Sequence, residues 1–225
     1  MKRICLASLA IAAVLGTGCN RNNTNAAKTD TAGTSGRVED NVSRGDRDFV
    51  QDVARANAAE IDLSRMSVDR ASSADVKKFA QMMVDDHTAA GAKLSGVATQ
   101  NHIDAPATPD DDHVSLREKL VAKQGLDFDK DYIDAMIDDH QKLVDKLESR
   151  IDRDTLSRWK GQVATTPDGD KAKVDVKAQT VLPEKSDDVV TQRINAWAAE
   201  TYPAAYAHLQ SAKAVKDTLK KRSTD

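Results

Sequence analysis

Four ionisable residues fall where apolar side chains are expected: Glu60, His87, His140 and His208. Each one occupies a position in a repeat of apolar residues spaced three and four apart, so each is predicted to face the interior of a helical protein. Three imidazoles and a carboxylate that meet at one level could hold a single transition metal ion, because imidazole suits zinc, copper, iron or nickel. The candidate ions are therefore zinc, iron, copper or manganese.

A second interpretation of these four residues stays open. Buried histidines that hydrogen-bond to Glu60, with Tyr132 nearby, would form a structural polar layer without any metal. If the four residues bind a metal, three others are candidates for orienting the ligands through contacts on the side away from the metal. These are Asp86 and Asp139, each directly before a histidine, and Tyr132. Two further histidines, His102 and His113, fall in or beside a loop, and we expect them to face solvent.

Helical periodicity predicts the elements that carry these residues. It extends over residues 46–70, 73–100, 129–152 and 187–221. The segment between the second and third helices contains Pro106, Pro109 and a predicted short helix over 114–123. Ser72 and Asp75 resemble a capping box at the start of the second helix.

The second and third predicted helices share a motif. It reads Phe79-x3-Met83-Val84-Asp85-Asp86-His87-x6-Leu94 in one and Tyr132-x3-Met136-Ile137-Asp138-Asp139-His140-x6-Leu147 in the other. Core packing explains the shared aromatic, Met and Leu positions, but it does not explain the repeated Asp-Asp-His. The repeat therefore singles out the two histidines.

Three runs resemble a bacterial domain-of-unknown-function family, DUF4142: EIDLSRMSVDRASSADVKKFAQMMVDDHTAAGAKL, FDKDYIDAMIDDHQKLVDKLE and YPAAYAHLQ. The resemblance covers about residues 46–152 and 187–215. It implies an all-α, ferritin-like four-helix bundle with a long crossover between its second and third helices, in an exported or lipid-anchored protein. Residues 153–186 are longer than the expected connection, and we expect an irregular insertion or a small hairpin there. The family has no established activity.

In a ferritin-like path, the second and third helices run parallel and the other two run oppositely. The four ionisable residues then differ in depth by about one helical turn, so they are predicted to converge. The Glu-x-x-His pairs of di-iron bundles are missing, because Val84, Ile137 and Ala205 stand three residues before the histidines. The pattern favours one metal ion over a di-iron centre.

The first 18 residues have the features of a secretory signal. Lys2 and Arg3 precede an apolar run of about 11 residues, which is too short to span a membrane, and small residues precede Cys19. The site resembles the lipobox of bacterial lipoproteins, although Gly16 replaces the usual Leu. Cys5 would leave with the signal, so Cys19 would be a lone cysteine in an oxidising compartment. Lipidation removes that liability.

Residues 19–45 are therefore predicted to be a lipidated cysteine and a flexible tether, and residues 46–225 the helical domain. Asn20 follows the cysteine, which in lipoproteins of the enteric type implies an outer-membrane lipoprotein facing the periplasm. A soluble periplasmic protein is the alternative.

Composition and motifs narrow the possible functions. The net charge is −3, and no basic stripe predicts a nucleic-acid partner. There is no Gly-rich phosphate loop and no nucleophile elbow, so the question of an enzyme stays open. Two hypotheses remain: an envelope protein that binds one metal ion, and a non-catalytic bundle that contacts a protein or cell-wall partner.

Overall fold

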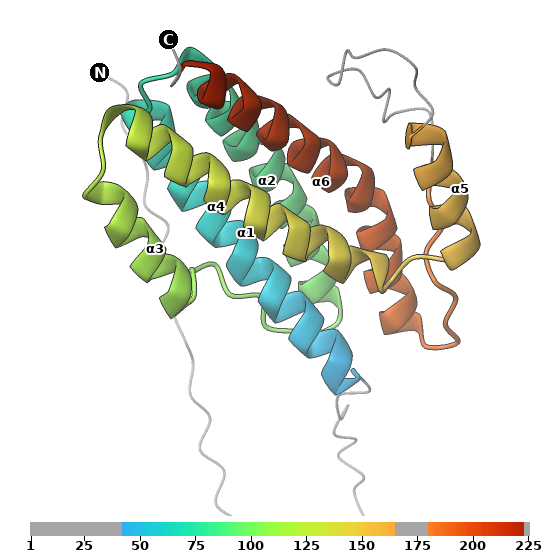
Figure 1. The fold of residues 1–225 in the computed structure, drawn as a ribbon. Coiled ribbons are helices and arrows are strands. Elements are labelled where there is room, and N and C mark those ends of the chain that lie inside the picture. The colour runs from blue at the N-terminus through green and yellow to red at the C-terminus, as the bar shows by residue number, and fades with distance from the viewer. Residues whose placement is uncertain (1–41, 165–179, 223–225) are drawn as a thin grey trace, which may run out of the picture. The chain divides into compact units, whose positions relative to one another are not determined.

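The computed structural model describes residues 42–164 and 180–222, and all regular elements in this part of the chain are helices (Figure 1). They are α1 (Arg44–Arg70), α2 (Ala74–Gln100), α3 (Asp111–Val121), α4 (Gly125–Glu148), α5 (Arg153–Ala164) and α6 (Val189–Arg222). The predicted all-α class is confirmed, and the predicted long helices begin and end within four residues of α1, α2, α4 and α6. The predicted signal, Cys19 and most of the tether lie outside the described residues.

Local side-chain bonds fix where three helices begin. Ser43 accepts a hydrogen bond from the backbone N–H of Asp46 at the start of α1, at 3.0 Å. Asp110 does the same for His113 in α3, at 2.9 Å. Asp152 accepts from the N–H of Thr155 at the start of α5, also at 2.9 Å. Each bond satisfies a backbone donor that lacks a partner within its own helix.

The four long helices pack as two antiparallel pairs. The closest packing joins α1 to α2 and α4 to α6, and α2 also contacts α6 while α1 contacts α4. The chain direction in Figure 1 shows α2 and α4 running the same way, with α1 and α6 opposed to them. The crossover from α2 to α4 contains α3. No helix among the described residues is long and apolar enough to cross a membrane.

The interior is divided into two apolar clusters, one toward each end of the long helices. One contains Phe49, Val53, Leu94, Val144, Leu147, Ile194 and Trp197. The other contains Leu63, Val76, Phe79, Met83, Tyr132, Met136 and Leu219. Glu60, His87 and His140 each fall between the two clusters along their own helix, and His208 lies at the boundary on α6. The packing therefore places a layer of ionisable residues between two apolar regions.

The structure corrects the interpretation of the segment after α4. The prediction of an irregular insertion or hairpin over 153–186 is wrong for its first part, which is α5. Trp159 of α5 packs against Tyr202 and Tyr206 of α6, with ring centroids 5.2 and 5.1 Å apart. A helix of 12 residues has only a short periodic pattern of apolar residues, which is too weak to predict the helix from the sequence. The tertiary contact with α6 stabilises it. The turn signal and the possible hairpin beyond it lie outside the described residues.

The predicted capping box at α2 is also wrong. The N-cap residue is Ser73, whose side chain makes no capping bond, and the N–H groups of Ser73 and of the residue before it are bound from another helix. Asp129 of α4 is fully buried and accepts from the backbone N–H groups of Ser72 and Ser73, at 2.9 and 2.8 Å. A carboxylate from a distant part of the sequence therefore caps α2 and joins it to α4.

We expect Asp129→Ala to lower the free energy of unfolding by about 1–3 kcal/mol, because it leaves two backbone donors without their acceptor. Urea unfolding followed by circular dichroism measures this. The matched control is Asp131→Ala, two residues along α4, which removes only an exposed ion pair with Lys123. Equal losses in the two variants would contradict the capping role.

Candidate metal centre

Four side chains from the four long helices meet inside the bundle. Glu60 of α1, His87 of α2, His140 of α4 and His208 of α6 are all buried, with exposed fractions of 1, 5, 0 and 6%. The three imidazole rings form a nearly equilateral triangle, with centroids 5.3, 5.5 and 5.5 Å apart. One ring nitrogen from each histidine lies within 4.8 Å of the others. This is the convergence that the helical register predicts.

Each histidine has an acceptor on one ring nitrogen. His140 Nδ1 lies 2.9 Å from the carbonyl oxygen of Met136, and His208 Nε2 lies 2.8 Å from Asp86 Oδ2. His87 Nδ1 lies 3.2 Å from Asn57 Oδ1. We therefore assign the N–H of each neutral ring to that nitrogen, since carbonyl and carboxylate oxygens only accept. The lone pairs then fall on His87 Nε2, His140 Nε2 and His208 Nδ1.

The spacing of these free nitrogens suits a small metal ion. His87 Nε2 and His140 Nε2 are 3.3 Å apart. Two nitrogens bound to zinc at about 2.0–2.1 Å in tetrahedral geometry are themselves separated by about 3.3 Å. The Nδ1 atom of His208 is buried and makes no hydrogen bond within the described residues. His208 Nδ1 is therefore available as a third nitrogen for an ion bound between the rings.

Glu60 lies behind two of the rings. Its Oε2 is 2.8 Å from His87 Nδ1, and its Oε1 is 3.5 Å from His140 Nδ1. Both contacts are ion-pair distances, but neither has hydrogen-bond geometry, so both buried oxygens stay without a hydrogen bond among the described residues. Burial raises the pKa of the carboxyl group, but the surrounding histidines outweigh it and lower the pKa to about 2. Glu60 is therefore ionised at neutral pH.

Burial and Glu60 shift the pKa values of two histidines in opposite directions. Burial lowers the pKa of His87, but Glu60, at 2.8 Å, outweighs burial and raises it above the usual 6.5. Burial lowers the pKa of His140 to about 4, against the opposing effect of Glu60. The two rings, whose Nε2 atoms are 3.3 Å apart, therefore differ in their affinity for a proton.

The residues predicted to orient the ligands lie in different places. Asp86 makes a direct hydrogen bond with His208. This bond lowers the pKa of the Asp86 carboxyl group, although partial burial acts in the opposite direction. Tyr132 instead lies 2.9 Å from Ser64 Oγ, and burial raises the pKa of its phenol. The carboxylate of Asp139 faces away from the rings, toward His113 and Lys142. Only Asp86 is in direct contact with a histidine of the centre.

Two contacts of the centre escaped the sequence analysis. Asn57 stands three residues before Glu60, on the same face of α1, and this spacing is the signal that could have identified it. The contact of Met136 is made by its backbone carbonyl, which every residue has, so the residue type could not have predicted it. The expectation that His113 faces solvent is wrong, because its side chain is only 15% exposed. His113 Nδ1 lies 2.6 Å from Asp110, and Nε2 lies 3.4 Å from Asp139.

Residues 32–166 match the family model described as Domain of unknown function (DUF4142). The chain belongs to this family. The matched segment of the DUF4142 protein contains Glu60, His87 and His140, whereas His208 of α6 lies beyond it. No curated protein and no solved structure shows a significant match.

The His113 contacts predict a pH dependence of stability in this DUF4142 protein. Interaction with Asp139, then with Asp110, outweighs burial and raises the pKa of His113 to about 9. A raised folded-state pKa gives stabilisation that is complete below the unfolded value of about 6.5 and is lost as pH rises to about 9. We therefore expect the difference in melting temperature between wild type and His113→Gln to shrink between pH 6.5 and 9. A difference that stays constant from pH 6 to 10 would contradict this.

Proposed function

We propose that this protein binds one divalent transition metal ion between its four long helices. The ligands are His87 Nε2, His140 Nε2 and His208 Nδ1. The observation that carries the proposal is the arrangement of acceptors: each ring has one nitrogen beside an oxygen acceptor, while His87 Nε2 and His140 Nε2 are 3.3 Å apart and each of the three histidines has a ring nitrogen within 4.8 Å of the others. Such oxygen partners on the far nitrogen are the usual companions of metal-binding histidines.

The carboxylates around the rings support a divalent ion. Glu60, which is buried, contacts His87 and His140, and Asp86, whose side chain is 53% exposed, contacts His208. A divalent ion near the buried carboxylate of Glu60 offsets its negative charge, which matters because burying net charge is costly. Because both contacts of Glu60 are with Nδ1 atoms, we assign it the role of holding these rings from behind, in place of the fourth-ligand role expected from the sequence.

A structural polar layer is the competing interpretation, and it accounts for the geometry less well. Polar groups retained only for structure are normally hydrogen-bonded when buried. Here both oxygens of Glu60 and Nδ1 of His208 are buried without such a bond in the described part of the chain. A metal ion bound between the rings would use the unpartnered nitrogen of His208.

The chemistry that follows is metal binding or buffering. Imidazole ligands favour zinc, copper or iron over manganese, and three protein ligands leave a position for water or a small ligand. We further propose that the bundle is ferritin-like, which the parallel directions of α2 and α4 across a long crossover support (Figure 1). The centre has three histidines and no Glu-x-x-His pair, so a single ion fits it better than a di-iron pair.

We expect zinc at 100 times its dissociation constant to raise the free energy of unfolding by about 2.7 kcal/mol, if only the folded state binds it. His140→Ala should abolish the effect by removing a ligand. His102→Asn is the matched control, because it removes an exposed histidine outside the centre, and Asn tolerates its positive φ of 55°. Thermal unfolding with and without zinc, copper or iron, combined with metal analysis of the purified protein, measures this.

The same thermal unfolding experiment with added metal, repeated at lower pH, adds a second test. Metal competes with protons for the imidazole nitrogens, so affinity should fall as pH decreases through the histidine range. If no metal stabilises the wild type, or if His140→Ala responds as the wild type does, the metal proposal fails. The contact with a protein or cell-wall partner then becomes the leading hypothesis.

We also propose that the protein acts in the cell envelope as a lipoprotein anchored through Cys19. The charged start, the short apolar run and the lone cysteine support this. Cys19→Ser should move the protein from the membrane fraction to the soluble fraction, and mass spectrometry of the wild type should show acyl chains at its N-terminus. An unchanged distribution together with an unacylated wild type would refute the anchor.

A further inference from the structure

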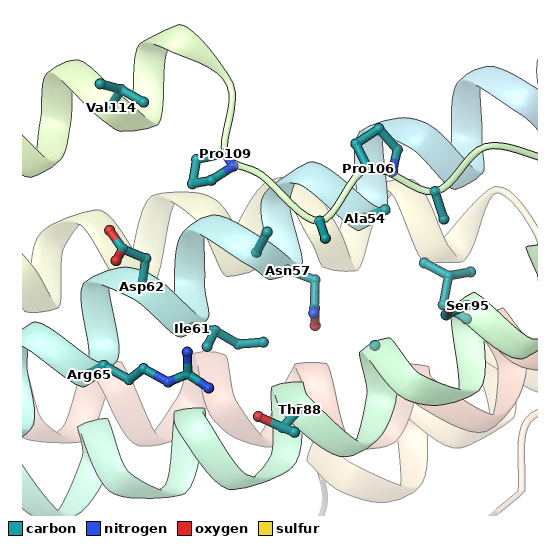
Figure 2. A pocket seen from close by; sticks show the side chains of 15 residues that line it. Ala54, Asn57, Ile61, Asp62, Arg65, Thr88, Ser95, Pro106, Pro109 and Val114 are labelled. Atoms are coloured by element: carbon teal, nitrogen blue, oxygen red, sulfur yellow. The ribbon is translucent and has the colours of Figure 1, made fainter.

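A cleft of about 600 Å³ opens beside the buried centre (Figure 2). Its walls come from α1, α2 and the crossover, with Pro106 and Pro109 of the crossover above the groove between the two helices. Six water molecules at liquid density occupy about 180 Å³, so the cleft has room for a hydrated ion. The centre itself is closed, since each of its four side chains is at most 6% exposed.

Asn57 forms the inner wall of this cleft and touches the centre at the same time. It lines the cleft, and its amide projects from α1 toward α2 (Figure 2). Its Oδ1 lies 3.2 Å from His87 Nδ1. The same nitrogen lies 2.8 Å from the carboxylate of Glu60, which stands one helical turn further along α1. The amide of Asn57 therefore borders the cleft on one side and the imidazole of His87 on the other, and His87 in turn contacts the carboxylate of Glu60.

The facing helix leaves room for this amide only because residue 91 is glycine. A Cβ atom built on Gly91 would lie 2.5 Å from Asn57 Nδ2, which is too close for two heavy atoms that are not bonded. The opposing atom is the end of a side chain, so an alanine here would displace the amide without requiring the helices to separate. Gly91 thus sets the width of the passage beside Asn57.

We propose that this cleft is the entrance for the metal ion and that Asn57 is its gate. The proposal rests on the metal centre proposed above. A divalent cation enters between the crossover and the two helices, meets the amide oxygen of Asn57 and is drawn inward by the buried carboxylate of Glu60, whose two oxygens make no hydrogen bond among the described residues. Rotation of the His87 ring then delivers the ion to the three nitrogens.

The lining of another opening favours this choice. A cleft on α4 and α6 is lined by residues that include Lys213, Lys216, Lys220 and Asp217. Neither Asn57 nor Asp86, whose side chains contact histidines of the centre, lines it. The α1–α2 cleft, by contrast, is lined by Asn57, which contacts the ligand histidine His87.

Rates of metal exchange test the entrance, because a gate changes the rate of entry and the rate of exit by the same factor. The probe is Co²⁺, mixed with the metal-free protein in a stopped-flow instrument and followed by its visible absorption; release is started with excess chelator. We expect Gly91→Ala to slow both processes about tenfold, which corresponds to a barrier higher by roughly 1.4 kcal/mol. The entry rate is the decisive quantity, because displacing the amide also changes its contact with His87 and so affects the dissociation constant.

The matched control is Gly96→Ala on the same helix, where an added Cβ meets nothing within 4 Å. It makes the same change in helix propensity and should exchange Co²⁺ at the wild-type rate. Asn57→Ala, which removes the gate, should speed both entry and exit. Circular dichroism and unfolding midpoints establish that the three variants are folded.

The possible results separate the two proposals. If the folded wild type binds no Co²⁺, the metal centre fails and the entrance fails with it. If the wild type binds Co²⁺ but Gly91→Ala exchanges it at the wild-type rate, only the entrance is refuted. A change in the dissociation constant with an unchanged entry rate also refutes the gate, because it shows that Asn57 positions His87 without controlling access.

Discussion

A buried carboxylate among three histidines is the constraint on which the centre of this protein depends. Glu60 is 1% exposed, and its ion-pair partners within residues 42–164 and 180–222 are histidines, with no arginine or lysine among them. An isolated buried carboxylate is strongly unfavourable, so the histidines must approach from the other helices. The four long helices are thereby held at one register, because a shift along any of them would separate its residue from this layer.

The two apolar clusters surround that layer and depend on its register. Each long helix contributes large apolar residues on both sides of its ionisable residue, and the aromatic contacts follow the same division. Phe79 packs on Tyr132 on one side, with ring centroids 6.3 Å apart, and Phe49 packs on Trp197 on the other, at 6.4 Å. Hydrophobic burial supplies the drive to fold, and the polar layer selects the alignment in which the histidines meet.

The crossover is attached mainly by polar contacts. Leu120 is the one buried residue of α3, while Arg117 pairs with Asp62 of α1 and His113 reaches Asp139 of α4. These polar contacts hold the crossover against the bundle without filling the space between them with large side chains. This explains why the cleft lies under the crossover, beside the tightly packed helices, and why a buried centre has solvent within reach of one of its contact residues.

The sequence by itself determined the helices and their inward faces, because periodicity of apolar residues is a local property that survives without knowledge of the fold. It placed Glu60, His87, His140 and His208 on those faces. Tertiary structure alone decided that Asp129 caps α2, that His113 is held by Asp139 and that α5 packs on α6. It also decided which nitrogen of each histidine is free. Each of these depends on a partner far away in the chain, and the direction of a ring or a carboxylate is set by what surrounds it once the helices have packed.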